Sequence, residues 1–136
     1  MTVQLLSPEG LFQPVPYHHV AVGTGSRHVV VSGQIARDGD ANHLATGDLT
    51  GQVEIVLRHT ARALAGAGAT FSDVVRLRFY AVDWKPEKAE AFMKGIENVT
   101  EELGLPTPLP PTSLIGVNYL WEPDVLVELE ADAILD

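Results

Sequence analysis

The stretch that decides the fold is residues 109–131, which read LPPTSLIGVNYLWEPDVLVELEA. It holds two runs in which alternate residues fall on opposite faces, at residues 113–120 and 126–133. The second run places apolar residues on one face and Glu128, Glu130 and Asp132 on the other. A period of two over runs of this length is typical of half-buried strands. The Glu-Pro-Asp turn signal at residues 122–124 predicts that the two strands pair as a hairpin.

The rest of the chain, taken outward from this stretch, predicts helices with a single apolar stripe alternating with further strands. One helix is expected at residues 51–65, capped by Asp48 or Thr50 and ended by glycines, and another from Pro86 to about residue 103, closed by Gly104. Strands are expected at residues 3–6, 18–22, 28–35 and 74–82, with a hairpin turn at residues 23–26. This order predicts an α+β two-layer fold, with two helices covering one face of a mixed sheet.

Composition bounds the kind of protein. A chain of 136 residues is expected to form a single domain over residues 1–136. The net charge of −9, without a lysine or arginine cluster, argues against nucleic acid as a partner. No apolar run approaches the ~20 residues of a membrane span, and no secretory signal is recognised. The absence of cysteine excludes disulfides and thiol chemistry. A cytoplasmic protein without membrane contact is therefore expected.

Six short motifs, spread over nearly the whole chain, resemble the RidA family (also called YjgF or L-PSP), small deaminases of imines and enamines. They are Pro16-Tyr17, Val31-Ser32-Gly33-Gln34-Ile35, residues 66–69 (GAGA) with residues 73–75 (DVV), Val82-Asp83, residues 110–113 (PPTS), and residues 126–131 (LVELEA). The resemblance implies a chorismate-mutase-like fold and a homotrimer with small-molecule clefts between subunits.

Site residues carried over by the resemblance lie in four of these motifs. Glu128 is expected to be catalytic, because the family places the first glutamate of its E-x-E-A run near the water that attacks the imine carbon; Glu130 is the second choice. Tyr17 is expected to lie over the ligand, and Ser32 and Gly33 to let the backbone approach it. The alternative for these polar groups is structural. Arg76 and Arg78 would then pair with Glu128 and Glu130 across strands or subunits.

Thr112 is the departure from the family pattern. Deaminating members carry arginine at this position and use it to bind the substrate carboxylate through two charged hydrogen bonds. Threonine offers one neutral hydrogen bond, and Leu114 adds an apolar wall two residues on. The difference predicts about tenfold or more weaker binding of a carboxylate. Arg76 and Arg78 are the candidates to replace the missing charge.

Neither a metal nor a cofactor is predicted. The histidines His18, His19, His28, His43 and His59 show no metal-binding spacing, and His18 and His19 point to opposite strand faces. The acidic segment at residues 38–42 lacks the twelfth-position glutamate of a calcium loop. The glycines at residues 66 and 68 follow a helix rather than a strand, so they do not form a dinucleotide fingerprint.

Two functions from different classes remain open at this point. The first is a RidA-type hydrolase that deaminates a small imine, enamine or carbonyl-type metabolite, with a substrate range altered by Thr112. The alternative is a non-catalytic trimer that binds a small molecule or regulates a partner. A third possibility is ribonuclease activity, which is ascribed to some family members. The net charge of −9 opposes the binding of a phosphate-rich substrate.

Overall fold

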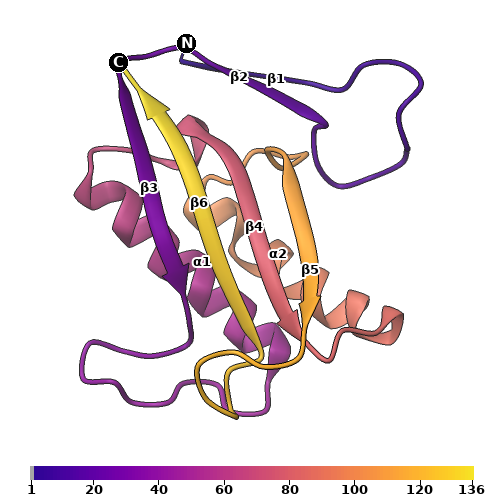
Figure 1. The fold of residues 1–136 in the computed structure, drawn as a ribbon, viewed down its shortest axis with the longest axis vertical. Coiled ribbons are helices and arrows are strands. Elements are labelled where there is room, and N and C mark those ends of the chain that lie inside the picture. The colour runs from indigo at the N-terminus through magenta and orange to yellow at the C-terminus, as the bar shows by residue number, and fades with distance from the viewer. Residues whose placement is uncertain (1) are drawn as a thin grey trace.

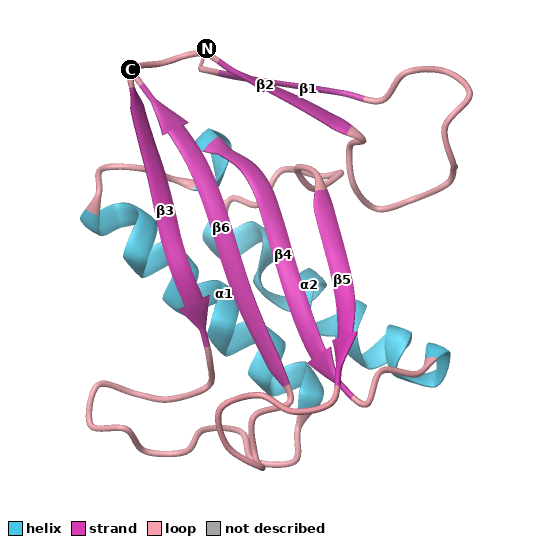
Figure 2. Cartoon of the chain, in the orientation of Figure 1, coloured by secondary structure: helices cyan, strands magenta, loops and turns pink. Residues whose placement is uncertain are grey.

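The computed structural model describes residues 2–136 and shows two helices packed behind a twisted sheet (Figure 1). Figure 2 shows all strands in magenta. The main sheet lies in front of the helices, and a separate two-stranded ribbon lies beyond one end of this sheet. Within these residues no helix is long and apolar enough to cross a membrane. In chain order the elements are β1 (Val3–Leu6), β2 (Val20–Gly23), β3 (Arg27–Gln34), α1 (Leu49–Gly66), a 3-10 turn (Phe71–Asp73), β4 (Val74–Val82), a second 3-10 turn (Pro86–Lys88), α2 (Ala89–Leu103), β5 (Thr112–Val117) and β6 (Val127–Leu135).

This element order confirms the α+β two-layer prediction, but both predicted hairpins are wrong. The main sheet has the order β3-β6-β4-β5, in which β5 pairs in parallel with β4 and not with β6. The ribbon contains β1 and β2, so β2 pairs with β1 instead of β3. Strand β6 inserts between β3 and β4, antiparallel to both. As the central strand it buries its whole apolar face, which a pairing with edge strand β5 alone would not achieve.

The core forms where the apolar strand faces meet the predicted helix stripes. Phe79 of β4 packs edge-to-face on Phe92 of α2, with the ring centroids 4.9 Å apart. The N-cap of α1 is Asp48, whose carboxylate accepts a hydrogen bond from the backbone N–H of Gly51 at 2.9 Å. The C-cap of α2 is Gly104 in the left-handed conformation. Both caps confirm the helix boundaries expected from the sequence.

Gln52 is a buried polar residue within the apolar stripe of α1. Its amide nitrogen donates to the carbonyl of Asp124 at 2.8 Å, and its amide oxygen accepts from the N–H of Leu126 at 2.9 Å. These bonds fasten the segment that leads into β6 to the helix. The long β5–β6 connection is therefore anchored on α1 and does not fold back as a hairpin.

The face of the sheet that points away from the helices is polar, as predicted. Arg76, Arg78 and Tyr80 of β4 lie on this open face, beside Glu128 and Glu130 of β6. On β3 the open face carries His28, Val30 and Ser32, which are exposed, whereas Val31 is buried. Val30 is 70% exposed at the centre of β3.

Candidate functional site

Three of the predicted site residues meet around one cavity of about 410 Å³. Tyr17, Thr112 and Leu114 line it together with residues of α2. The loop that carries Tyr17 is held in place because its backbone bridges that of Leu109, with reciprocal bonds at 2.7 and 2.9 Å to the flanking residues. Thr112 and Leu114 stand opposite the buried Leu77 and Phe79 in the β4–β5 register, so their side chains point to the helix side of the sheet.

The Thr112 hydroxyl is already engaged within its own strand. It donates to the carbonyl of Pro110 at 2.7 Å. Because a hydroxyl has a single proton, what remains for a ligand is acceptor capacity. A carboxylate offers only acceptors, so Thr112 in this arrangement gives it no donor.

Glu128 lies on the open face, beside the predicted residues of β3. The register between β3 and β6 shifts between Val31 and Gln34, and Gly33 lies at this irregularity. A Cβ on Gly33 would fall 2.7 Å from Cδ and 2.9 Å from Cγ of Glu128. The missing side chain of Gly33 therefore makes the space in which the Glu128 carboxylate lies. Ser32 next to it is exposed, and its carbonyl accepts from the Gln34 amide at 3.1 Å.

Glu128 and Glu130 have opposite electrostatic environments. Glu130 accepts hydrogen bonds from the Tyr80 hydroxyl at 2.8 Å and from Arg78 Nη1 at 3.0 Å, and these bonds lower the pKa of its carboxyl. The Tyr80 pKa is raised, chiefly by this bond to Glu130. The side-chain carboxyl of Glu128 has no hydrogen-bond partner among residues 2–136. Its pKa is raised above 4.5, first by burial and then by the charge of Glu130. The two neighbouring carboxyls therefore have pKa values shifted in opposite directions.

Arg78 and Arg76 differ in whether they form the ion pairs with Glu128 and Glu130 that a structural role would require. Arg78 forms the ion pair with Glu130 that the structural alternative predicted. Arg76 lies opposite Asp132 in the register and donates to the Ser113 hydroxyl at 2.7 Å, so it does not pair with Glu128. The Nε atom of Arg76 is buried without a partner within the described residues. Both arginines belong to the open face of β4, and neither lines the helix-side cavity beside Thr112.

The six predicted residues therefore form two groups on opposite faces of one sheet. Tyr17, Thr112 and Leu114 lie at the helix-side cavity beside edge strand β5, whereas Ser32, Gly33 and Glu128 lie on the open face at β3 and β6. Strands β5 and β6 are separated by β4, which sets their backbones about 10 Å apart at the usual strand spacing. A small ligand that touches both groups would have to take one group from each of two copies of the chain.

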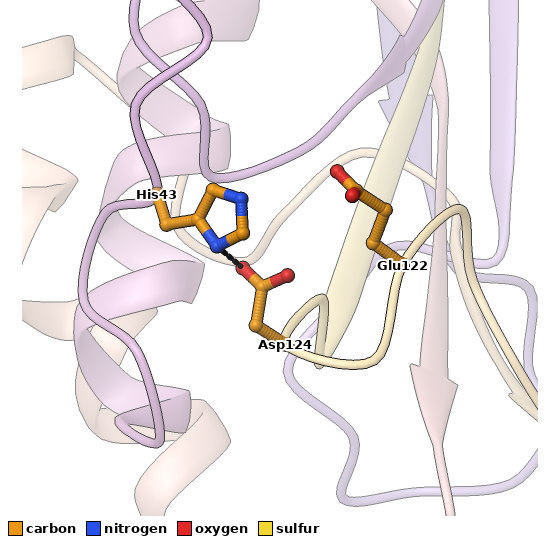
Figure 3. A group of neighbouring side chains, drawn as sticks. All are labelled: His43, Glu122 and Asp124. Atoms are coloured by element: carbon orange, nitrogen blue, oxygen red, sulfur yellow. Dashed lines mark ion pairs between the residues drawn. The ribbon is translucent and has the colours of Figure 1, made fainter.

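A second cluster of ionisable groups, His43, Glu122 and Asp124, is drawn in Figure 3. It lies on the loops after β3 and before β6, at the end of the sheet opposite the termini (Figure 1). His43 Nδ1 lies 3.3 Å from Asp124 Oδ2, and Glu122 stands nearby. Arg37 pairs with both carboxylates, at 2.7 Å to Asp124 and 2.8 Å to Glu122, and it lowers the pKa of Asp124. The guanidinium thus pairs with both acidic residues of the cluster, and these ion pairs join the loop after β3 to the loop before β6.

Sequence reasoning missed the aromatic and thioether wall of the cavity. Trp84 and Met93 line it, and the Trp84 ring packs edge-to-face on Phe92 with centroids 5.7 Å apart. Phe92 and Ile96 lie on the apolar stripe of the second helix and also line the cavity. The usable signal was Trp84 itself, a large aromatic residue placed directly after a strand and before the proline turn that begins the helix.

Comparisons with known proteins agree with this architecture. The family described as Endoribonuclease L-PSP matches residues 12–135. A RutC family protein of Pyrococcus abyssi is 28% identical over 134 residues, covering 98% of each chain. The Rid family protein YyfB of Yersinia pestis is 32% identical with a TM-score of 0.88, covering 99% of this chain and 100% of that one. Rv2704 of Mycobacterium tuberculosis, a YjgF/YER057c/UK114 family member, is 30% identical with a TM-score of 0.60, covering 98% and 99%. The chain belongs to the RidA/YjgF/L-PSP family.

Proposed function

We propose that this protein is a homotrimeric hydrolase of small imines or enamines, whose site joins the cavity of one copy to Glu128 of a neighbouring copy. The observation that carries the proposal is the contrast between two adjacent carboxylates. Glu130 is fixed by Arg78 and Tyr80, whereas Glu128 is partnerless among the described residues, half-buried and raised in pKa. Paired titratable groups whose environments separate their pKa values are typical of acid–base sites.

The reaction follows from two successive proton transfers through Glu128. The carboxylate accepts a proton from water as the water oxygen bonds to the imine carbon, and the C=N double bond becomes a single bond to an amine nitrogen. The Glu128 carboxyl then gives its proton to that nitrogen, which completes a carbinolamine. The carboxylate next takes the proton of the carbinolamine hydroxyl and passes it to the amine, so the C–N bond breaks, ammonia leaves and the hydroxyl oxygen becomes the carbonyl. One water is consumed and one ammonia is released, so the glutamate ends as it began. Tyr17 and the backbone at Ser32 and Gly33 would hold the substrate in place.

Subunit assembly is part of the proposal, because the two residue groups lie on opposite faces of one sheet. The open face suits contact between copies, since it presents Val30 at 70% exposure and Ile115 at 39% among polar groups. Sedimentation analysis should give about three times 14.7 kDa. A monomer at assay concentration would exclude a site shared between copies.

Turnover is tested with imines made in situ by an amino-acid oxidase, in the presence of semicarbazide, which traps imine that has not been hydrolysed. The wild type should reduce trapping, and Glu128→Gln should lose this effect while keeping its size and fold. Asp132→Asn is a matched control, because Asp132 is a carboxylate on the same strand face two rows away. Equal activity of wild type and Glu128→Gln would refute the role of Glu128.

A non-catalytic small-molecule binder of the same family is the second candidate. It is favoured by the Thr112 hydroxyl, which bonds to Pro110 and leaves no donor for a substrate carboxylate. Absence of turnover for wild type and for Thr112→Arg, with ligand binding retained, would move this candidate to first place. Ribonuclease activity is not proposed, because the net charge of −9 opposes binding of a phosphate backbone.

A further inference from the structure

The cavity beside β5 has the chemistry of a site for an uncharged, apolar group. None of its described lining residues is charged. Apolar side chains form most of its wall: Trp84 after β4, Phe92, Met93 and Ile96 of α2, and Leu114 of β5. Its volume of about 410 Å³ lies in the range of small-molecule pockets, which are mostly apolar with a few placed polar groups. An apolar cavity of about 150 Å³ is already enough to bind benzene.

The polar groups at the cavity do not suit an anion. The Thr112 hydroxyl donates its hydrogen bond to the Pro110 carbonyl. The Ser113 hydroxyl accepts a hydrogen bond from Arg76, which itself does not line the cavity. A carboxylate placed here would lose hydration without gaining a cation, which is costly. An amide, imine or carbonyl group would lose much less.

The apolar wall is rigid on one side and adaptable on the other. Trp84 is held by its edge-to-face contact with Phe92, which in turn contacts the buried Phe79. Met93 is half-buried at the cavity, and a flexible thioether can adjust to the shape of a bound ring or branched chain. A bulky apolar substituent would therefore meet a fixed aromatic surface and a mobile side chain.

We infer that this cavity selects an uncharged ligand with a bulky apolar substituent, and that Trp84 and Met93 determine this specificity. The inference deepens the proposed function and rests on it for the reaction, since it names the substrate class as imines that lack a carboxylate. The apolar group would lie against Trp84, with the reacting C=N carbon directed out of the cavity toward Glu128 of the neighbouring copy.

Binding is tested with two probes of nearly equal shape, phenylacetamide and phenylacetate, by calorimetry on the whole protein. Phenylacetamide should bind about tenfold or more tightly than phenylacetate, and Thr112→Arg should reverse the order. Trp84→Ala should weaken phenylacetamide binding about tenfold, and Trp84→Phe should retain most of it. Trp121→Ala is the matched control, because Trp121 is 75% exposed and does not line the cavity.

Several outcomes would overturn the inference without reference to variants. Phenylacetate that binds as tightly as phenylacetamide, or more tightly, would do so. Failure of both probes to bind would also do so, because it would mean that a side chain of another copy fills the cavity.

A turnover experiment tests the ligand class and the proposed reaction separately. The two imines to compare come from phenylalanine with an amino-acid oxidase and from phenethylamine with an amine oxidase, and they differ by a carboxylate. Turnover of the first imine alone would keep the proposed function and reject the uncharged substrate class. Selective binding of phenylacetamide without any turnover would reject the hydrolase and keep the ligand class.

Discussion

Replacing Gly33 by alanine should lower turnover while leaving the free energy of unfolding nearly unchanged. Gly33 does not have a left-handed backbone, so the strand accepts an alanine there without strain. The added Cβ would fall 2.7 Å from Cδ of Glu128, whereas unstrained carbon atoms stay about 3.5–4.0 Å apart. The Glu128 side chain must therefore move by about 1 Å. It can do so because it is the flexible end of a partly exposed residue and has no described partner to break.

The two expected effects differ greatly in size. A misplacement of about 1 Å in a reacting group costs about 10²-fold in rate, so turnover should fall by about that factor. The folding free energy should change by less than about 1 kcal/mol, because alanine is favoured over glycine within a strand by roughly 0.5–1 kcal/mol and offsets the adjustment of one side chain. Loss of activity with retained stability is the signature of a residue that acts by leaving space.

The assay is the trapped-imine competition, run beside a urea denaturation curve for each variant. Gly66→Ala is the matched control, because a Cβ at Gly66 meets nothing within 4 Å, and its activity should equal that of the wild type. In the Glu128→Gln background, Gly33→Ala should cost no further activity, since both changes act through the same group. Wild-type turnover by Gly33→Ala would refute the placement of the reacting carboxylate against β3.

Two further predictions concern stability. The pKa of Glu128 in the folded protein is raised above 4.5, so the wild type loses stability as the pH rises through that folded pKa. Glu128→Gln should therefore be the more stable protein at pH 7, and denaturation curves should show this advantage fading below pH about 4. A constant difference in stability across the pH range would contradict this. Gln52→Leu leaves the Asp124 carbonyl and the Leu126 N–H without their hydrogen-bond partner, so it should lower the free energy of unfolding by about 2–4 kcal/mol. Gln4→Leu, at the exposed position of β1, should change it little in the same urea experiment.

The strands and helices were predictable because each is set by local periodicity and caps. Asp48, Gly104 and the alternation along β6 are signals that lie within or beside their own elements. Strand pairing was not predictable in the same way. The turn signal before β6 indicates a reversal, but the partner of β6 depends on contacts made across the fold. Gln52 holds the end of this turn on α1, and Arg37 binds Asp124 within it, and neither contact has a sequence signature.

Candidate site residues could be named from the sequence, but their geometry could not. The motif positions do gather, but in two groups, because the β4–β5 register turns Thr112 and Leu114 toward the helices while Glu128 faces away from them. The role of Tyr80 was also missed, although it shares the period-two face of Arg78 and stands across from Glu128. Its bond to Glu130 depends on a side-chain rotamer, and periodicity does not determine rotamers.

The separation of the two residue groups by the thickness of one sheet has a genetic meaning. A copy that lacks Glu128 still has a sound cavity, and a copy with a blocked cavity still offers its glutamate. If sites form between copies, mixed assemblies of two inactive alleles will contain some junctions in which both halves are intact. The two defects would then complement each other in one cell, whereas two lesions in the same half would not.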